Sequence, residues 1–186
     1  MSKAADLAKF IGNSEQNMKL LLDATISSAV SEYDIDSTYI NSTYDTYVLN
    51  YNLLPSTDNK QLQARVFVGG TVQTGDIYQY ENAHLAASSY GSSSGGAYFR
   101  LSFIENGSAA GEGIIGSVTF RNVNSTSVPF SWTQLSNHFN NSSVHYAAAH
   151  GGALLAANRA DVVNGWRFYY ESGNIASGNV KLYGIY

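Results

Sequence analysis

The sequence of 186 residues contains no cysteine, which excludes disulfide bonds and thiolate metal sites. A chain of this length can still bury an apolar core without covalent cross-links. The absence of cysteine also fits synthesis in a reducing cytosol. We therefore expect a fold that is held together by packing and hydrogen bonds alone.

Charge is scarce as well, because Asp, Glu, Lys and Arg make up 13% of the residues and the formal net charge is -4. Binding to nucleic acid through its phosphates requires a basic surface, so we expect no nucleic-acid partner. No apolar run approaches the roughly 20 residues of a membrane-spanning helix, and the N-terminus lacks the apolar centre of a signal peptide. We expect no membrane partner.

The motifs of common catalytic and metal sites are missing. No HExxH, GxSxG or phosphate-binding loop occurs, and most acidic residues lie in expected turns, as do Glu105, Glu112 and Glu171. Asp34 and Asp36 are compatible with a calcium loop, but the glycine and terminal glutamate of an EF-hand are absent. We expect no enzyme activity, no cofactor and no metal.

What the chain does contain, after residue 17, is repeated alternation of apolar and polar residues, which predicts β-strands. In 45–54, for example, every second residue is Tyr or Leu. Further strands are expected at 18–26, 61–68, 76–85, 97–104, 114–123, 129–139, 162–170 and 180–186. Roughly eight to ten short strands with regular turns favour an all-β fold, an antiparallel jelly-roll-like β-sandwich.

Several segments between the expected strands have a composition that predicts a turn, a loop or a bend. The PSTDN sequence at 55–59 predicts a hairpin turn, and SSYGSSSGG at 88–96 has the composition of a flexible loop. Residues 144–157 are interpreted as a strand, a bend and a strand. Helix is the alternative for this Ala-rich segment, but the pair Gly151 and Gly152 argues against a continuous helix. The apolar strand at the end of the chain is expected to pair inside the sheet and close the fold.

The first residues predict a short helix that begins after Ser2 as its N-cap. Leu7, Phe10 and Ile11 fall on one face of it, and Gly12 follows as a stop signal. So short a helix is marginal alone and must dock on something, either its own domain or a neighbouring protein. We expect 1–16 to be a docking arm and 17–186 to be the β-sandwich.

Both ends of the chain carry a resemblance. The C-terminal WRFYYESGNIASGNVKLYGIY resembles the closing motif of β-sandwich virion proteins of marine tailed bacteriophages, and MSKAADLAKFIGN resembles the N-terminal segment of phage tail-fibre and appendage proteins. The resemblance implies a structural protein of the virion, in the tail or appendage or as a capsid decoration or cement protein. Its partners would be capsid, portal, tail or fibre proteins. Because fibre domains are commonly trimers, a homo-oligomer, possibly a trimer, is expected.

Aromatic residues are the remaining candidates for contacts, since the chain has 14 tyrosines and cannot bury all of them. Exposed tyrosine serves both protein interfaces and stacking on sugars. An assembly interface is the preferred interpretation, and a carbohydrate-binding module for host surface glycans is the alternative. The candidate contact residues are Tyr33, Tyr39, Tyr44, Tyr78, Tyr80 and Tyr90.

Overall fold

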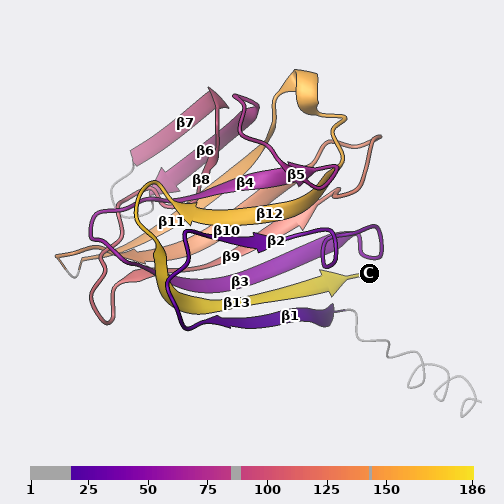
Figure 1. Cartoon of the computed structure of the whole chain (residues 1–186). Coiled ribbons are helices and arrows are strands. Elements are labelled where there is room, and N and C mark those ends of the chain that lie inside the picture. The colour runs from indigo at the N-terminus through magenta and orange to yellow at the C-terminus, as the bar shows by residue number, and fades with distance from the viewer. Residues whose placement is uncertain (1–17, 85–88, 143) are drawn as a thin grey trace, which may run out of the picture.

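The computed structural model describes residues 18–84, 89–142 and 144–186 and shows two antiparallel sheets packed as a β-sandwich (Figure 1). The fold class predicted from the sequence is confirmed. The predicted N-terminal helix, with its docking residues Leu7, Phe10 and Ile11, lies outside the described residues. Within them, the one helical element is a 3-10 turn, η1 (Ala156–Asn158).

The larger sheet, sheet A, has eight strands, and β1 and β7 form its two edges. In spatial order its strands are β1 (Met18–Ile26), β13 (Ile175–Ile185), β3 (Thr46–Pro55), β9 (Gly113–Arg121), β10 (Ser131–Phe139), β11 (His145–Leu154), β6 (Tyr78–His84) and β7 (Ser89–Gly96). The last strand of the chain, β13, lies between β1 and β3, so the expected closure of the fold is confirmed.

The smaller sheet, sheet B, lies against one part of sheet A. Its strands are β2 (Glu32–Ile35), β12 (Val163–Tyr170) and β4 (Leu62–Val68), followed on the far side of β4 by β5 (Thr71–Val72) and β8 (Phe99–Arg100). β5 and β8 pair with opposite ends of β4. Sheet B is therefore narrower than sheet A and leaves part of it unopposed.

The order of pairing is that of a jelly roll. The early and late strands pair in nested order, β1 with β13, β2 with β12, β3 with β9 and β4 with β8. Successive pairs alternate between sheet A and sheet B. A long antiparallel hairpin wrapped across two sheets gives this arrangement.

The remaining strands widen sheet A. The insertion between β4 and β8 supplies β6 and β7, and the insertion between β9 and β12 supplies β10 and β11. These four strands continue sheet A beyond β9. We call them the extension, and we call β1, β13, β3 and β9 with sheet B the jelly-roll region.

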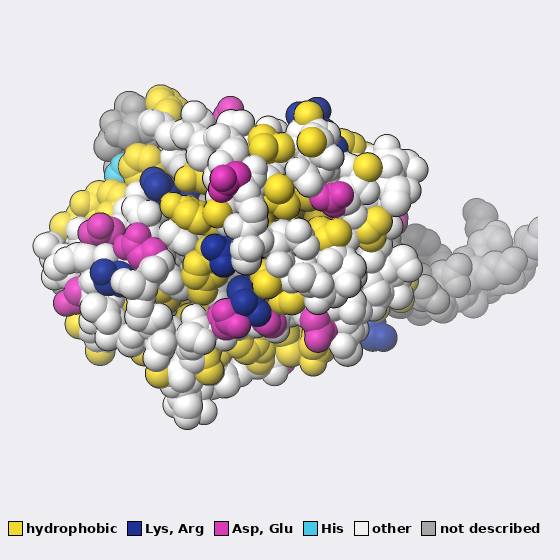
Figure 2. Space-filling model, turned by 45° about the horizontal axis from the view of Figure 1, so that its top comes forward, with side chains coloured by type: hydrophobic (Ala, Val, Ile, Leu, Met, Phe, Trp, Pro, Cys, Tyr) yellow, Lys and Arg dark blue, Asp and Glu magenta, His cyan; other side chains and the backbone are white. Residues whose placement is uncertain are grey.

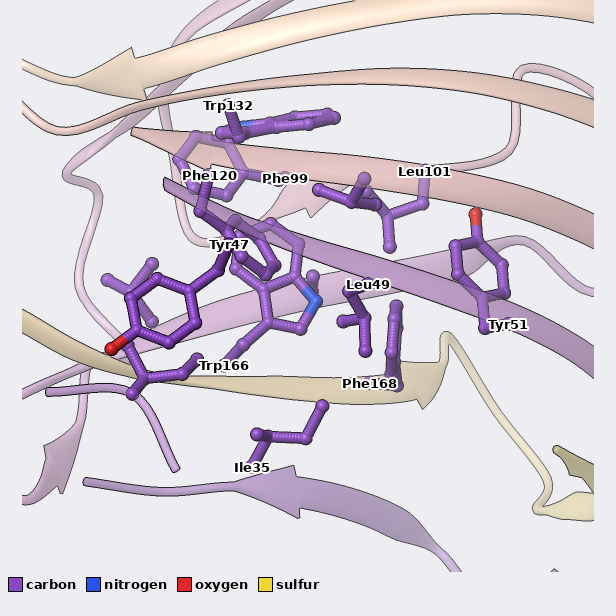
Figure 3. Close-up of a cluster of buried hydrophobic side chains, with 14 of the residues drawn as sticks. Ile35, Tyr47, Leu49, Tyr51, Phe99, Leu101, Phe120, Trp132, Trp166 and Phe168 are labelled. Carbon is purple, nitrogen blue, oxygen red and sulfur yellow. The ribbon is translucent and has the colours of Figure 1, made fainter. Parts of the chain in front are cut away.

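The core between the two sheets is aromatic (Figure 3). Trp166 of sheet B packs on Phe120 of sheet A, with ring centroids 4.7 Å apart, and on Trp132 at 5.8 Å. Phe168 packs on Tyr51 at 4.9 Å. The predicted alternation explains this core, since Tyr47, Leu49, Tyr51 and Leu53 all point inward from β3.

Three connections differ from the sequence-based expectation. The PSTDN turn does not join a hairpin, because β3 and β4 lie in different sheets. The Ser-Gly segment is not a loop, because 89–96 forms β7 along β6. Residues 145–154 form one strand through both glycines, without a bend. In each case pairing with neighbouring strands overrides local composition.

Candidate functional site

The candidate site is the outer face of the extension, the face turned away from the core. Side chains alternate between the two faces of a strand, so inward Trp132, Gln134 and His138 place Leu135 outward on β10. Strand register then places an outward residue of each neighbouring strand beside it. Within the described residues, sheet B covers only the opposite, inner face.

One row of this face runs across all four strands of the extension. Leu135 of β10 is opposite Ala149 of β11, which is opposite Ala83 of β6, which is opposite Tyr90 of β7. Leu135 is 68% exposed and Tyr90 is 80% exposed. Three interstrand spacings separate them, about 14 Å. The row is apolar, with a large side chain at each end and the two alanines between them.

A hollow of about 950 Å³ lies over β11, β6 and β7 along this row. It exists because the outward residues of β11 are small, and Gly151 follows Ala149 on the same face. Polar groups line its other side. Gln79, Glu81, Ser92 and Ser94 belong to the neighbouring rows. The hollow therefore offers one exposed aromatic ring, one carboxylate, one amide and several hydroxyls over a flat floor.

A second hollow, of about 420 Å³, continues the outer face toward the jelly-roll region. Ile115, 52% exposed, is opposite Asn137, and Leu135 is opposite Ser117, so the two apolar side chains are diagonal neighbours. Around them the lining is amide-rich, with Asn50, Asn52, Asn137 and Asn179, and carries one cation, Lys181. An apolar centre with a polar rim is typical of protein interfaces.

The remaining tyrosine candidates divide by burial. Tyr44, Tyr78 and Tyr80 are buried in the core, so they are not available for surface contacts. The Tyr78 hydroxyl donates to the Gln73 carbonyl at 2.6 Å, and burial raises the pKa of Tyr78 to about 12. Tyr33 and Tyr39 are half-buried and pack against the core. Tyr80 and Tyr90 both line the larger hollow, and of these two Tyr90 is the exposed one.

The inner face of the extension carries a buried polar network that the sequence analysis missed. Gln134 accepts a hydrogen bond from the Tyr51 hydroxyl at 2.9 Å and donates to the Leu101 carbonyl at 2.6 Å. The Ser136 hydroxyl lies 2.9 Å from Nε2 of His138. The signal was present in SWTQLSNHF, where the residues in phase with Trp132 are polar.

Two histidines of this network are held neutral by their surroundings. Burial lowers the pKa of His138 to about 3, and the nearby His150 adds to the effect. Burial lowers the pKa of His150 to about 4. Nδ1 of His138 lies 3.4 Å from the amide oxygen of Asn106, whereas the His150 ring interacts with the backbone of Arg100. His145 and His150 lie on opposite faces of β11, and His145 is exposed whereas His150 is buried.

Three of the carboxylates considered for catalysis or calcium binding, Asp34, Glu112 and Glu171, are engaged in local contacts. Asp34 pairs with Arg167 at 2.6 Å, and Glu32 pairs with the same guanidinium at 2.7 Å. Glu112 accepts a hydrogen bond from the Ala109 amide, and Glu171 accepts one from the Gln61 amide. In the part of the chain that the structure describes, no three His, Asp or Glu side chains come together as a metal site.

The rest of the surface is sparsely charged. Figure 2 shows one face, on which isolated cationic side chains lie among polar surface and scattered apolar atoms, several of them close to Asp or Glu. None of the described helical turns is long and apolar enough to span a membrane.

No protein-family model matches the chain, and no curated protein matches it.

Proposed function

We propose that this protein is a non-enzymatic structural component of a tailed-phage virion, which attaches through residues 1–16 and presents its β-sandwich on the particle. The observation that supports an assembly role is the outer face of sheet A. It places Leu135 and Ile115, both largely exposed, inside an amide-rich and nearly uncharged rim. The resemblance of the two chain ends to phage proteins supplies the virion setting.

Assembly is favoured because the apolar side chains of this face are exposed to water in the isolated chain. Burying apolar surface gains about 25 cal/mol per Å². The amide rim can hydrogen-bond to a protein neighbour without the desolvation penalty of charges. A neighbouring virion protein or a sister copy is the partner that matches this combination.

Attachment is tested by mixing particles that lack the protein with the full chain and with a chain lacking 1–13. We expect the shortened chain to fold and to lose attachment, as seen by electron microscopy. The position of the full chain would assign it to head or tail. Attachment that survives the truncation would contradict the anchoring role of the N-terminal segment.

The outer face has its own test. Leu135→Asn removes the apolar centre without touching the core, and we expect weaker attachment or weaker lateral contacts on the particle. Val128→Asn is the matched control, since Val128 is 49% exposed and lies outside both hollows. Equal occupancy of the particle by both variants would argue against the outer face as the assembly surface.

A carbohydrate-binding role is the second candidate, and the hollow beside Tyr90 is the observation that favours it. An exposed aromatic ring stacks on the apolar face of a sugar, while Glu81, Gln79 and the serines can bond its hydroxyls. A glycan array of host surface polysaccharides tests this, with Tyr90→Ala expected to abolish any signal. Tyr186→Ala, at an exposed tyrosine elsewhere, is the control. If the unmodified chain binds no glycan on the array, the carbohydrate-binding role is rejected and only the structural role remains.

A further inference from the structure

The edges of the two sheets differ in how they are protected against pairing with another strand. An edge strand presents unpaired backbone N–H and C=O groups, and proteins blunt such edges with short length, charges, proline or bulges. Sheet A ends in β1 and β7. Sheet B ends in β2 on one side and in β5 and β8 on the other.

Four of these edges are blunted. β5 and β8 each have two residues, and β2 has four, of which Glu32 and Asp34 are acidic and paired with Arg167. β1 has nine residues, but it carries Lys19 and Asp23, and its register is broken by a bulge between residues 20 and 22. None of these strands offers a long and regular free edge.

The β7 edge has none of these protections along its regular part, residues 89–94. It has eight residues, SYGSSSGG, without a charge or a proline. It pairs with β6 without a register shift from Ser89 to Ser94, and its irregularity falls at the end, next to Gly95. Among the described residues no strand pairs with its other side, and Figure 1 shows β7 at the end of the sheet opposite β1. Serine and glycine side chains leave this backbone accessible.

We propose that β7 is a strand-pairing site and that its partner is β7 of a second copy, antiparallel to it across a two-fold axis. Backbone donors and acceptors on a free edge fit another extended strand and no other surface. A two-fold axis lets one strand supply both sides of the contact. Because β7 is uncharged, placing it opposite itself brings no like charges together. The inference goes beyond the proposed function and does not depend on it.

The alternation of faces restricts the register of this pair. Tyr90, Ser92 and Ser94 share the outer face, and directly opposed residues of paired strands must lie on the same face. A two-fold axis at Ser92 satisfies this within the regular part of the strand. It places Tyr90 of each copy opposite Ser94 of the other. The aromatic ring that is 80% exposed in one copy then covers the strand of its partner.

The first test is the oligomeric state of the pure full-length chain by sedimentation equilibrium. We expect a dimer, and we expect Ser92→Lys to shift it to monomer, with a dissociation constant raised at least tenfold, because two ammonium groups would face each other at the axis. Ser127→Lys, at an exposed serine in the connection between β9 and β10 and outside both hollows, is the matched control and should stay dimeric. A monomeric or trimeric wild type, or a dimer that Ser92→Lys leaves intact, would overturn the proposal.

The second test uses the absence of cysteine, which makes a single introduced thiol unambiguous. We expect Ser92→Cys to form a covalent dimer on mild oxidation, because the two Cβ atoms would be about 4.5–5.5 Å apart. Thr25→Cys, on the opposite edge β1, should remain mostly monomeric after oxidation. Cross-linking at Thr25 and not at Ser92 would assign the contact to the other edge. Since both tests use isolated protein, their failure is distinguishable from a failure to attach to particles.

Discussion

The jelly-roll region and the extension share sheet A but have different interiors. Between the two sheets, Trp166, Phe120, Phe99 and Phe168 form a continuous aromatic cluster. In the extension, His84, His138 and His150 face inward in place of apolar residues. β10 of the extension connects the two interiors, because its Trp132 contacts the aromatic cluster while its Gln134 hydrogen-bonds within the polar network.

The difference follows from what covers each part. Sheet B covers the jelly-roll region with apolar side chains on regular strands. The inner face of the extension is covered partly by the connection after β8, through the Leu101 carbonyl, the ring of Phe103 stacked on His84 and the amide of Asn106 beside His138. A polar interior contributes less to stability than apolar packing, because each buried polar group must recover its desolvation cost. We therefore infer that the extension is less stable than the jelly-roll region. The extension also carries the larger hollow, beside Tyr90, and the β7 edge.

The largest expected effect comes from breaking the aromatic interior. Trp166→Ala removes a side chain that is 1% exposed and contacts four other aromatic rings, which should cost about 3–5 kcal/mol of unfolding free energy. Urea denaturation followed by circular dichroism measures it. Val128→Ala, at an exposed position, is the control. A loss below about 1 kcal/mol would contradict the assignment of the stabilising core.

Low pH should destabilise the polar interior of the extension. The folded protein holds His138 and His150 at pKa values of about 3 and 4, below their ordinary 6.5, so the unfolded chain binds protons first as the pH falls. Their contribution to stability is therefore present above pH 6.5 and is lost as the pH falls, down to about pH 4 for His150 and about pH 3 for His138. The loss is roughly 1.4 kcal/mol per pH unit for each histidine.

Denaturation at pH 7 and at pH 5.5 measures this loss. We expect the combined His138→Gln and His150→Gln variant to show a clearly smaller dependence on pH. His145→Gln, at an exposed histidine, should behave as the unmodified chain does. If removing both buried histidines leaves the pH profile unchanged, another group is responsible for it.

The polar network can be examined one residue at a time. Gln134→Leu leaves the Tyr51 hydroxyl and the Leu101 carbonyl without this partner, so we expect a cost of about 1–3 kcal/mol. His150→Leu, by contrast, removes a ring whose one polar contact among the described residues is with the backbone of Arg100, and should cost less. Thermal or urea unfolding compares the two variants. The reverse order of stability would show that His150, not Gln134, holds the network.

The alternating strands of this fold were predictable, because their large apolar residues share one face. β3 and β12 were correctly assigned on that basis. β7 was not predictable from its composition, because glycine has low strand propensity and the segment is held extended by pairing with β6, its one partner strand in the described part of the chain. Likewise, the sequence of a turn does not show whether the chain stays in one sheet, and the PSTDN hairpin was wrong for this reason.

The candidate site was predictable in part. Tyr90 was among the expected contact residues, but the burial of Tyr44, Tyr78 and Tyr80 depends on the sheet packing. Leu135 shows why the outer face was missed. Hydrophobicity alone favours Leu135 inside and Gln134 outside, yet they lie the other way round. Trp132 sets the phase of β10, since its larger apolar surface gains more from burial.

The smallest expected effect is on the outer face. Leu135→Asn should change the unfolding free energy by less than about 0.5 kcal/mol, because the side chain is mostly in water in the isolated chain. Urea denaturation checks this, next to the Trp166→Ala variant. A large loss would mean that Leu135 serves the fold itself, and its exposure would then say nothing about assembly.

Native-state hydrogen exchange tests the central difference between the two regions most directly. We expect amides of β3, β12 and β13 to exchange only through global unfolding, and amides of β6 and β11 to exchange through a smaller opening that becomes easier at pH 5.5. Equal protection of both regions at both pH values would show instead that the extension is as stable as the jelly-roll region.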